Sequence, residues 1–247
     1  MSATYDETML RGRLKELHLP AIRSCFAEEA VLARQESLPY EHYLQILTER
    51  ESQLRRSNRI ERFLRESKLP LEKRLDTFDL GRLPSKAAMQ ARTLLSGDFL
   101  DRCENVLAFG NPGSGKTHLL CAIAQELIRS GRRIYFSTCS MLVQELLRAK
   151  QELRMNRFLK SLARYEAIVL DDIGYVQQQR EEMEVLFTLL AERYERRSVM
   201  LTSNLPFSRW EEIFKDPMTT AAAIDRLVHH SVIIELNVPS YRLEEAR

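Results

Sequence analysis

One stretch of the sequence combines glycines, a lysine and a threonine at a spacing that suits phosphate binding. The residues Gly110-Asn-Pro-Gly-Ser-Gly-Lys-Thr117 match the pattern G-x-x-x-x-G-K-[ST] at every fixed position. Glycines let backbone N–H groups turn toward a phosphate where a Cβ would clash, and the helix expected next directs its positive N-terminal end at the anion. Lys116 is expected to reach the β- and γ-phosphates, and the Thr117 hydroxyl to ligate Mg²⁺. The predicted ATP-binding residues are Gly110, Asn111, Pro112, Gly113, Ser114, Gly115, Lys116, Thr117 and His118.

Two adjacent acids follow an apolar run further along the chain. The run Ile168–Leu170 ends at Asp171 and Asp172. Because ligands of open parallel sheets bind beyond the carboxyl ends of the strands, Asp171 is expected to hold Mg²⁺, directly or through water. Asp172 is placed to orient or deprotonate the attacking water. The alternative, in which the acids cap the next helix or are only solvated, is disfavoured by the phosphate loop upstream.

Two further polar residues occupy positions where they could complete such a site. Asn204 follows the apolar run that begins at Val199, and it would hydrogen-bond the γ-phosphate or the attacking water. Ser-Asn after a strand is also ordinary turn chemistry, so this signal alone is weak. Arg226 lies in a helical stretch, and its guanidinium could stabilise charge on the transferring phosphoryl group. A surface arginine paired with Asp225 or Glu235 is the alternative, and the spacing does not decide between the two.

The elements that must position these residues alternate between strands and helices. Apolar runs typical of strands occur at 106–109, 133–137, 167–170, 198–202 and 232–236, and helical patterns lie between them, including one long helix expected over 141–164. This alternation predicts an α/β fold with a central parallel sheet that helices cover on both faces. The phosphate-binding motif follows one such run and opens a helix, which disfavours a chance match in a glycine-rich turn.

The first part of the chain has a different character. Residues 1–67 contain a single glycine, Gly12, and no run typical of a strand, so we expect a small all-helical N-terminal domain that binds DNA or a partner. Residues 68–84 include Pro70, Gly81 and Pro84 and are typical of a linker. The ATPase domain is expected over residues 85–247.

Bulk composition narrows the class of protein. Hydrophobic residues make up 44% of the chain and charged residues 29%, which suits a folded protein with a core. The four cysteines lie far apart, which favours free thiols over a disulfide framework or a zinc site. No apolar run approaches the length needed to cross a bilayer and the N-terminus lacks a secretion signal, so we expect a cytoplasmic protein with no membrane partner.

Positive charge is concentrated in two segments although the formal net charge is only +2. Residues 50–74 hold nine Lys or Arg against four Glu, and residues 148–164 hold six against one Glu. Such clusters can neutralise DNA phosphates with little sequence preference, but solvated helix faces are an equally good explanation. The candidate DNA-binding residues are Arg55, Arg56, Arg59, Arg148, Lys150, Arg154, Arg157 and Lys160.

These motifs together resemble the AAA+ ATPases, and within them the IstB-like transposition helper proteins of insertion sequences, to which the helicase loader DnaC is related. The resemblance is most specific over 105–119 and then over Leu170-Asp-Asp-Ile-Gly-Tyr175, and it extends downstream to Asp225-Arg-Leu-Val-His-His230 and Ser240-Tyr-Arg-Leu243. It implies that Asn204 is the sensor-1 residue, that Arg226 is the finger that completes a neighbour's ATP site, and that Arg242 is the sensor-2 arginine. One departure is that Asp172 stands where AAA+ proteins commonly have glutamate, so hydrolysis is expected to be slow.

The resemblance also implies a task, partners and cofactors. It implies a helper that binds ATP and Mg²⁺, forms a homo-oligomer on double-stranded DNA largely independently of sequence, and recruits or activates a transposase of the IstA type. A helicase loader acting in replication would share every residue of the ATP site. A metabolic kinase would share the phosphate loop, but it would gain nothing from the basic segments or from Arg226.

Overall fold

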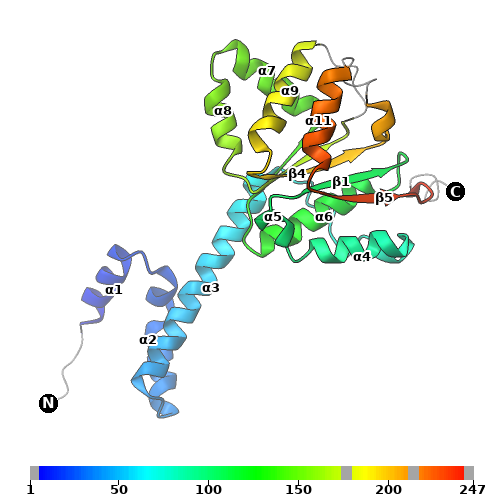
Figure 1. Cartoon of the computed structure of the whole chain (residues 1–247). Coiled ribbons are helices and arrows are strands. Elements are labelled where there is room, and N and C mark those ends of the chain that lie inside the picture. Colours follow the sequence, from blue (N-terminus) through cyan, green and yellow to red (C-terminus); the bar gives the residue numbers. More distant parts are fainter. Residues whose placement is uncertain (1–5, 174–179, 211–216, 242–247) are drawn as a thin grey trace. The chain divides into compact units, whose positions relative to one another are not determined.

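The structure is a computed structural model that describes residues 6–173, 180–210 and 217–241 (Figure 1). The chain forms two compact units, residues 1–62 and 63–247, and the boundary between them lies inside the long helix α3 (Tyr40–Ser67). The division expected from the sequence, with a linker over 68–84, stays a prediction. No helix among the described residues is long and apolar enough to span a bilayer.

The first unit is helical and holds a small core of its own. It contains α1 (Glu7–Glu16), α2 (Pro20–Gln35) and the start of α3. Its buried apolar residues are Leu14, Ile22, Phe26 and Leu47. The Glu51 carboxylate accepts hydrogen bonds from the backbone N–H groups of Ala21 (2.9 Å) and Ile22 (3.3 Å). Glu51 thereby satisfies donors at the start of α2, where a helix has no backbone partners of its own.

The second unit is built on a parallel sheet of five strands in the order β2-β3-β4-β1-β5. The strands are β1 (Asn105–Gly110), β2 (Ile134–Thr138), β3 (Ala167–Asp171), β4 (Ser198–Ser203) and β5 (Ser231–Leu236). All residues of β3 and β4 are buried, as expected for central strands of a sheet covered on both faces. Because β3, β4 and β1 are neighbours, the residues that follow them meet at one edge of the sheet.

Helices lie on both sides of this sheet. Figure 1 shows α4, α5 and α6 on one face and α7, α9 and α11 on the other. The helices and short 3-10 turns of the second unit are η1 (Leu80–Arg82), α4 (Ser85–Leu94), α5 (Asp98–Asp101), α6 (Lys116–Arg129), α7 (Cys139–Gln151), α8 (Met155–Leu162), α9 (Arg180–Arg193), η2 (Phe207–Arg209) and α11 (Pro217–Val228). The predicted α/β fold with a central parallel sheet is confirmed. All four cysteines are free, and Cys121 and Cys139 are buried.

The prediction of a single helix over 141–164 is wrong, because this stretch forms two helices, α7 and α8. Leu153 adopts a left-handed backbone with φ of 54° between the two helices. The backbone N–H of Arg154 donates to the Ala149 carbonyl (2.7 Å) and that of Leu153 to the Lys150 carbonyl (3.1 Å). These bonds close a Schellman motif, which ends a helix and usually places glycine at the left-handed position. A leucine at this position gives no sequence signal for the break.

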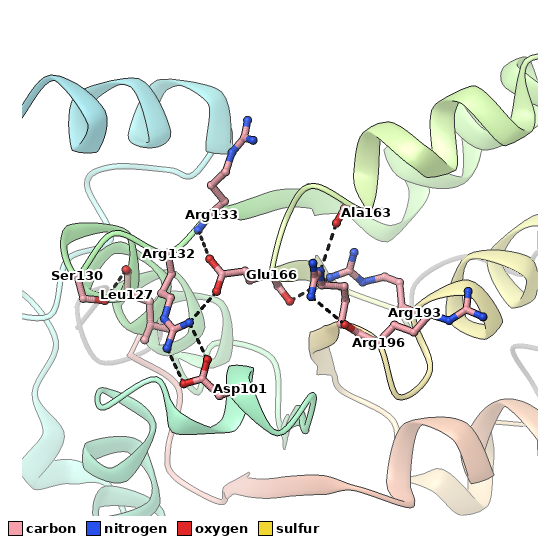
Figure 2. A network of polar contacts seen from close by, with 10 residues as sticks. Asp101, Leu127, Ser130, Arg132, Arg133, Ala163, Glu166, Arg193 and Arg196 are labelled. Atoms are coloured by element: carbon pink, nitrogen blue, oxygen red, sulfur yellow. Dashed lines mark hydrogen bonds and ion pairs between the residues drawn. The ribbon is translucent and has the colours of Figure 1, made fainter. Parts of the chain in front are cut away.

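A polar network holds the amino ends of β2, β3 and β4 in register. Figure 2 shows Glu166, just before β3, joined to the Arg132 guanidinium (2.8 Å) and to the Arg133 backbone N–H (3.0 Å). Arg132 also pairs with Asp101 (2.7 Å). Arg193 is buried nearby and donates to the carbonyls of Leu162 (3.2 Å), Tyr165 (3.1 Å), Glu166 (3.3 Å) and Ser198 (2.9 Å). Burial lowers the pKa of Arg193 to about 9, so it stays charged at neutral pH.

Replacing Arg193 with methionine is expected to lower the free energy of unfolding by about 3 kcal/mol, because several buried carbonyls lose their donor at once. The measurement is urea denaturation of the parent and the variant. Arg196→Met is the matched control, because Arg196 is exposed and its contact with Glu192 is a surface pair. Equal stability of Arg193→Met and the parent would show that these carbonyls find other donors.

Candidate nucleotide site

The phosphate loop lies between β1 and α6 and is shaped by glycines with positive φ. Gly113 and Gly115 have φ of 80° and 91°. A Cβ at Gly113 would collide with the Ser240 side chain, and one at Gly115 would lie 3.0 Å from the Phe78 ring. Two segments far away in the sequence therefore close over this loop, and the glycines are required both by its backbone and by these contacts.

Buried polar groups that could contact a nucleotide lie in the loop and beside it. The Lys116 ammonium is held inside the loop, where it donates to the carbonyls of Gly110 (2.8 Å) and Asn111 (2.9 Å). Among the described residues, the buried Ser114 Oγ and Asn204 Oδ1 have no hydrogen-bond partner. Buried polar atoms without a partner are rare in folded proteins, and at this position they fit a nucleotide with its attacking water.

The structure brings the predicted acids against the loop. Asp171 Oδ1 accepts a hydrogen bond from Thr117 Oγ1 (2.7 Å) and a second from Thr202 Oγ1 (2.7 Å). Asp172 follows with a left-handed backbone, φ of 59°. Aspartate and asparagine tolerate this conformation better than most residues, which is one physical reason for a short acid here. The hydroxyl of Thr117 and the carboxylate of Asp171 are oxygen donors of the kind that Mg²⁺ prefers.

One cavity of about 630 Å³ lies between the phosphate loop, Asp172 and Asn204. Its lining residues are Lys73, Thr77, Phe78, Pro112, Gly113, Gly115, Lys116, Thr117, His118, Asp172, Asn204 and Tyr241. The volume lies within the range of cofactor sites in proteins. The predicted residues Lys116, Thr117, Asp172 and Asn204 therefore share one cavity.

Several residues of this cavity are not among those predicted from the sequence. Lys73, Thr77 and Phe78 come from the segment 68–84, and Tyr241 comes from the end of the described chain. The His118 ring meets Phe78 edge-on with ring centroids 5.2 Å apart, and His118 Nε2 donates to the carbonyl of Arg74 (3.0 Å). The Tyr241 backbone N–H donates to the carbonyl of Gly113 (3.0 Å). Lys73, Thr77 and Phe78 belong to none of the motifs above and, like Tyr241, they reach the site through the packing of segments that are distant in the sequence.

Arg226 lies near the amino end of β1, whereas the phosphate loop follows the carboxyl end of the same strand. Its backbone carbonyl accepts a hydrogen bond from the Asn105 side chain (3.3 Å) at the start of β1, whereas the loop begins at the other end of this strand. Five residue steps of about 3.3 Å separate the two ends. The Arg226 guanidinium lies 4.6 Å from the Phe187 ring centroid and donates to the Ala222 carbonyl (2.9 Å).

The alternative interpretation of Arg226 as half of a surface ion pair gains no support, because no ion pair among the described residues joins it to Asp225 or Glu235. The other predicted arginine of the site, Arg242, falls outside the described residues.

The candidate DNA-binding residues differ in how far their charge is already neutralised. Arg55 donates to Glu51 (3.0 Å) and to the His18 carbonyl (2.8 Å) inside the first unit. Lys150 pairs with Glu184 (2.9 Å), and Arg154 pairs with Glu152. No ion pair within the described parts of the chain involves the remaining candidates, which are Arg56, Arg59, Arg148, Arg157 and Lys160. Arg148, Arg154 and Arg157 line one hollow of about 410 Å³ beside α8.

A parallel sheet in this strand order, with a phosphate loop after β1, acids at the end of β3 and a polar residue after β4, defines a P-loop ATPase of the AAA+ class. Within that class, the chain belongs to the IstB-like ATP binding protein family, whose sequence profile matches residues 12–247.

Relatives and a solved structure agree with this assignment. An insertion sequence ATP-binding protein of Sinorhizobium fredii is 41% identical over 244 residues, which are 98% of this chain and 82% of that protein. The insertion sequence IS5376 ATP-binding protein of Geobacillus stearothermophilus is 38% identical over 231 residues, 94% of this chain and 92% of that protein. The crystal structure of the DnaC helicase loader has a TM-score of 0.56 and 20% identity, and it covers 66% of this chain and 96% of that chain. At this identity the likeness to DnaC concerns the fold.

Proposed function

We propose that this chain is an ATP-dependent, DNA-binding helper of transposition that assembles on target DNA and recruits or activates its transposase. The observation that carries the ATPase part is the 2.7 Å hydrogen bond from Thr117, which lines the cavity, to Asp171 at the end of β3. The relatives are named as insertion sequence ATP-binding proteins, which supports the task in transposition.

Each residue of the proposed ATP site has a separate role in hydrolysis. Lys116 neutralises charge on the β- and γ-phosphates, and Thr117 and Asp171 would hold Mg²⁺, which supplies further charge neutralisation when bound. Asp172 orients the attacking water and takes its proton, and Asn204 hydrogen-bonds the water or the γ-phosphate. The short Asp172 side chain holds that water less closely than a glutamate would, so turnover is slow. Phe78 and Tyr241 supply flat apolar surface for the nucleobase.

Arg226 completes the site of a neighbouring subunit. It lies near the start of β1, at the sheet edge opposite its own phosphate loop. An arginine at one edge and a nucleotide at the other fit a head-to-tail arrangement of subunits, in which each arginine meets the next subunit's γ-phosphate. This arrangement makes hydrolysis depend on assembly.

DNA is bound through its phosphates by the basic residues of α7, α8 and the first unit. Arg148, Arg157 and Lys160 are the strongest candidates of the second unit, because within the described chain no carboxylate pairs with them. Phosphate contacts of this kind carry little sequence information, so the proposed binding is largely indifferent to sequence. Arg56 and Arg59 are the corresponding candidates of the first unit.

Changing Arg148, Arg157 and Lys160 together to alanine is expected to reduce the magnitude of the slope of log affinity against log salt by about 2 to 3 units. Each cation that contacts a DNA phosphate contributes about 0.9 to this slope, because its binding releases counterions from the DNA. The measurement is affinity for duplex DNA across a salt series. The double variant Lys150→Ala and Arg154→Ala is the control, since Glu184 and Glu152 already pair with these charges. Equal slopes for the triple variant and the parent, with ATP binding retained, would show that these residues do not contact DNA and belong to a solvated helix face.

A helicase loader is the second candidate function, favoured by the fold shared with DnaC. The ATP site does not separate the two candidates, because both would use the same residues. Affinity purification of the full chain in the presence of ATP and DNA distinguishes them by the partner retained. A transposase supports the proposal, and a replicative helicase supports the alternative.

A further inference from the structure

The hydroxyl of Thr202 contacts both acids of the site. Thr202 is fully buried on β4. Its Oγ1 donates to Asp171 Oδ1 (2.7 Å) and accepts from the backbone N–H of Asp172 (2.8 Å). Its backbone carbonyl accepts from the N–H of Ile173 (3.1 Å). Three consecutive residues after Leu170 are thus bonded to one residue of the neighbouring strand.

These bonds occur where the regular sheet ends. The pairing of β3 with β4 stops at Leu170 and Leu201. Beyond that point the N–H of Asp172 needs another acceptor, because a buried donor without a partner is costly. The Thr202 hydroxyl supplies this acceptor while Asp172 turns out of the strand with φ of 59°. The same turn places the Asp172 side chain on the cavity that Asn204 lines.

We propose that Thr202 is a positioning residue, whose single hydroxyl fixes the carboxylate of Asp171 for Mg²⁺ and the backbone of Asp172 for its work on the attacking water. The proposal rests on the function proposed above for these two acids. Thr202 has one hydroxyl hydrogen, which it donates to Asp171, and its oxygen lone pair accepts from Asp172.

The two threonines bonded to Asp171 have different roles in this arrangement. The Thr117 hydroxyl is a predicted metal ligand as well as a donor to Asp171, so replacing it would remove both contacts at once. Thr202 is not a predicted metal ligand, so replacing it tests the positioning of the acids without removing a ligand. Residues that hold a metal ligand in place commonly change metal affinity by 10- to 100-fold when they are replaced, and this is the order of effect expected here.

The test compares Thr202→Val, which keeps the branched shape and removes the hydroxyl, with Thr202→Ser, which keeps the hydroxyl. Binding of a fluorescent ATP analogue is titrated against Mg²⁺, and phosphate release gives kcat and KM. Thr202→Val is expected to need about tenfold more Mg²⁺ for half-maximal binding and to lower kcat by about tenfold or more, with little change of affinity in EDTA. Thr202→Ser is expected to restore both values.

Ser198→Ala is the matched control, because Ser198 is a buried hydroxyl on the same strand whose Oγ has no partner within the described chain. Parent-like Mg²⁺ dependence and kcat in Thr202→Val would overturn the proposal, as would equal impairment of Thr202→Ser. If Thr202→Val does not fold, Thr202→Ala takes its place as the variant without a hydroxyl and is compared with Thr202→Ser. Asp171→Asn separates the role proposed for Thr202 from the role proposed for Asp171. If Asp171→Asn does not alter the Mg²⁺ dependence, the metal role of Asp171 itself is refuted, whatever the result for Thr202.

Discussion

Lys116→Ala is expected to abolish productive ATP binding, whereas Asp172→Asn is expected to leave binding intact and stop turnover. Lys116 is a buried cation inside the phosphate loop, so its loss leaves the phosphate charge without its partner. Losing one member of a buried charged pair lowers affinity by about 100-fold or more. Asp172 instead lines the cavity without belonging to the loop, and the loss of a general base lowers kcat by about 100-fold or more.

Both variants are measured in the same two assays, nucleotide titration and phosphate release. The Asp172→Asn protein should accumulate in an ATP-bound form with an affinity within about threefold of the parent, because asparagine keeps the shape of the side chain. Hydrolysis by Asp172→Asn at the parent rate would remove Asp172 from the catalytic role. Undiminished ATP binding by Lys116→Ala would refute the assignment of the phosphate loop.

The parts of the site that depend on local chemistry can be predicted from the sequence. The phosphate loop is continuous in the sequence and its glycines are needed for its backbone, so a motif suffices to place it. Asp171, Asp172 and Asn204 could be placed because each follows an apolar run, and parallel strands end at one edge of a sheet. The structure brings Asp172 and Asn204 to the cavity that Lys116 lines.

The remaining residues of the site depend on packing between distant segments. Phe78 comes from a stretch that has the composition of a linker, and Tyr241 lies more than 120 residues beyond the phosphate loop. The break at Leu153 was missed because a leucine occupies a left-handed position that usually needs glycine. Thr202 was missed because a threonine inside a strand is unremarkable until its hydrogen bonds are known.

The second large effect concerns the sharing of ATP sites between subunits. Arg226→Ala is expected to lower hydrolysis strongly, because arginines that contact the transferring phosphoryl group contribute about 10³-fold or more. Its position near Asn105, away from the phosphate loop, predicts that this effect is exerted on the neighbour. ATP affinity of the Arg226→Ala chain should therefore remain close to that of the parent.

This arrangement predicts that two inactive chains can complement each other. In a mixture of Lys116→Ala and Arg226→Ala, some interfaces combine an intact phosphate loop from one chain with an intact Arg226 from the other. Random head-to-tail mixing in equal amounts would make about one interface in four of this kind. A mixture of Lys116→Ala and Asp172→Asn is the control, because no interface in it holds a complete site.

The most direct test is therefore phosphate release by these mixtures in the presence of Mg²⁺, ATP and duplex DNA, with assembly followed by light scattering. Activity of up to about a quarter of the parent rate is expected from the mixture of Lys116→Ala and Arg226→Ala, and no activity is expected from the control mixture. No activity from the first mixture, in assemblies shown to contain both chains, would contradict an ATP site that is shared between subunits.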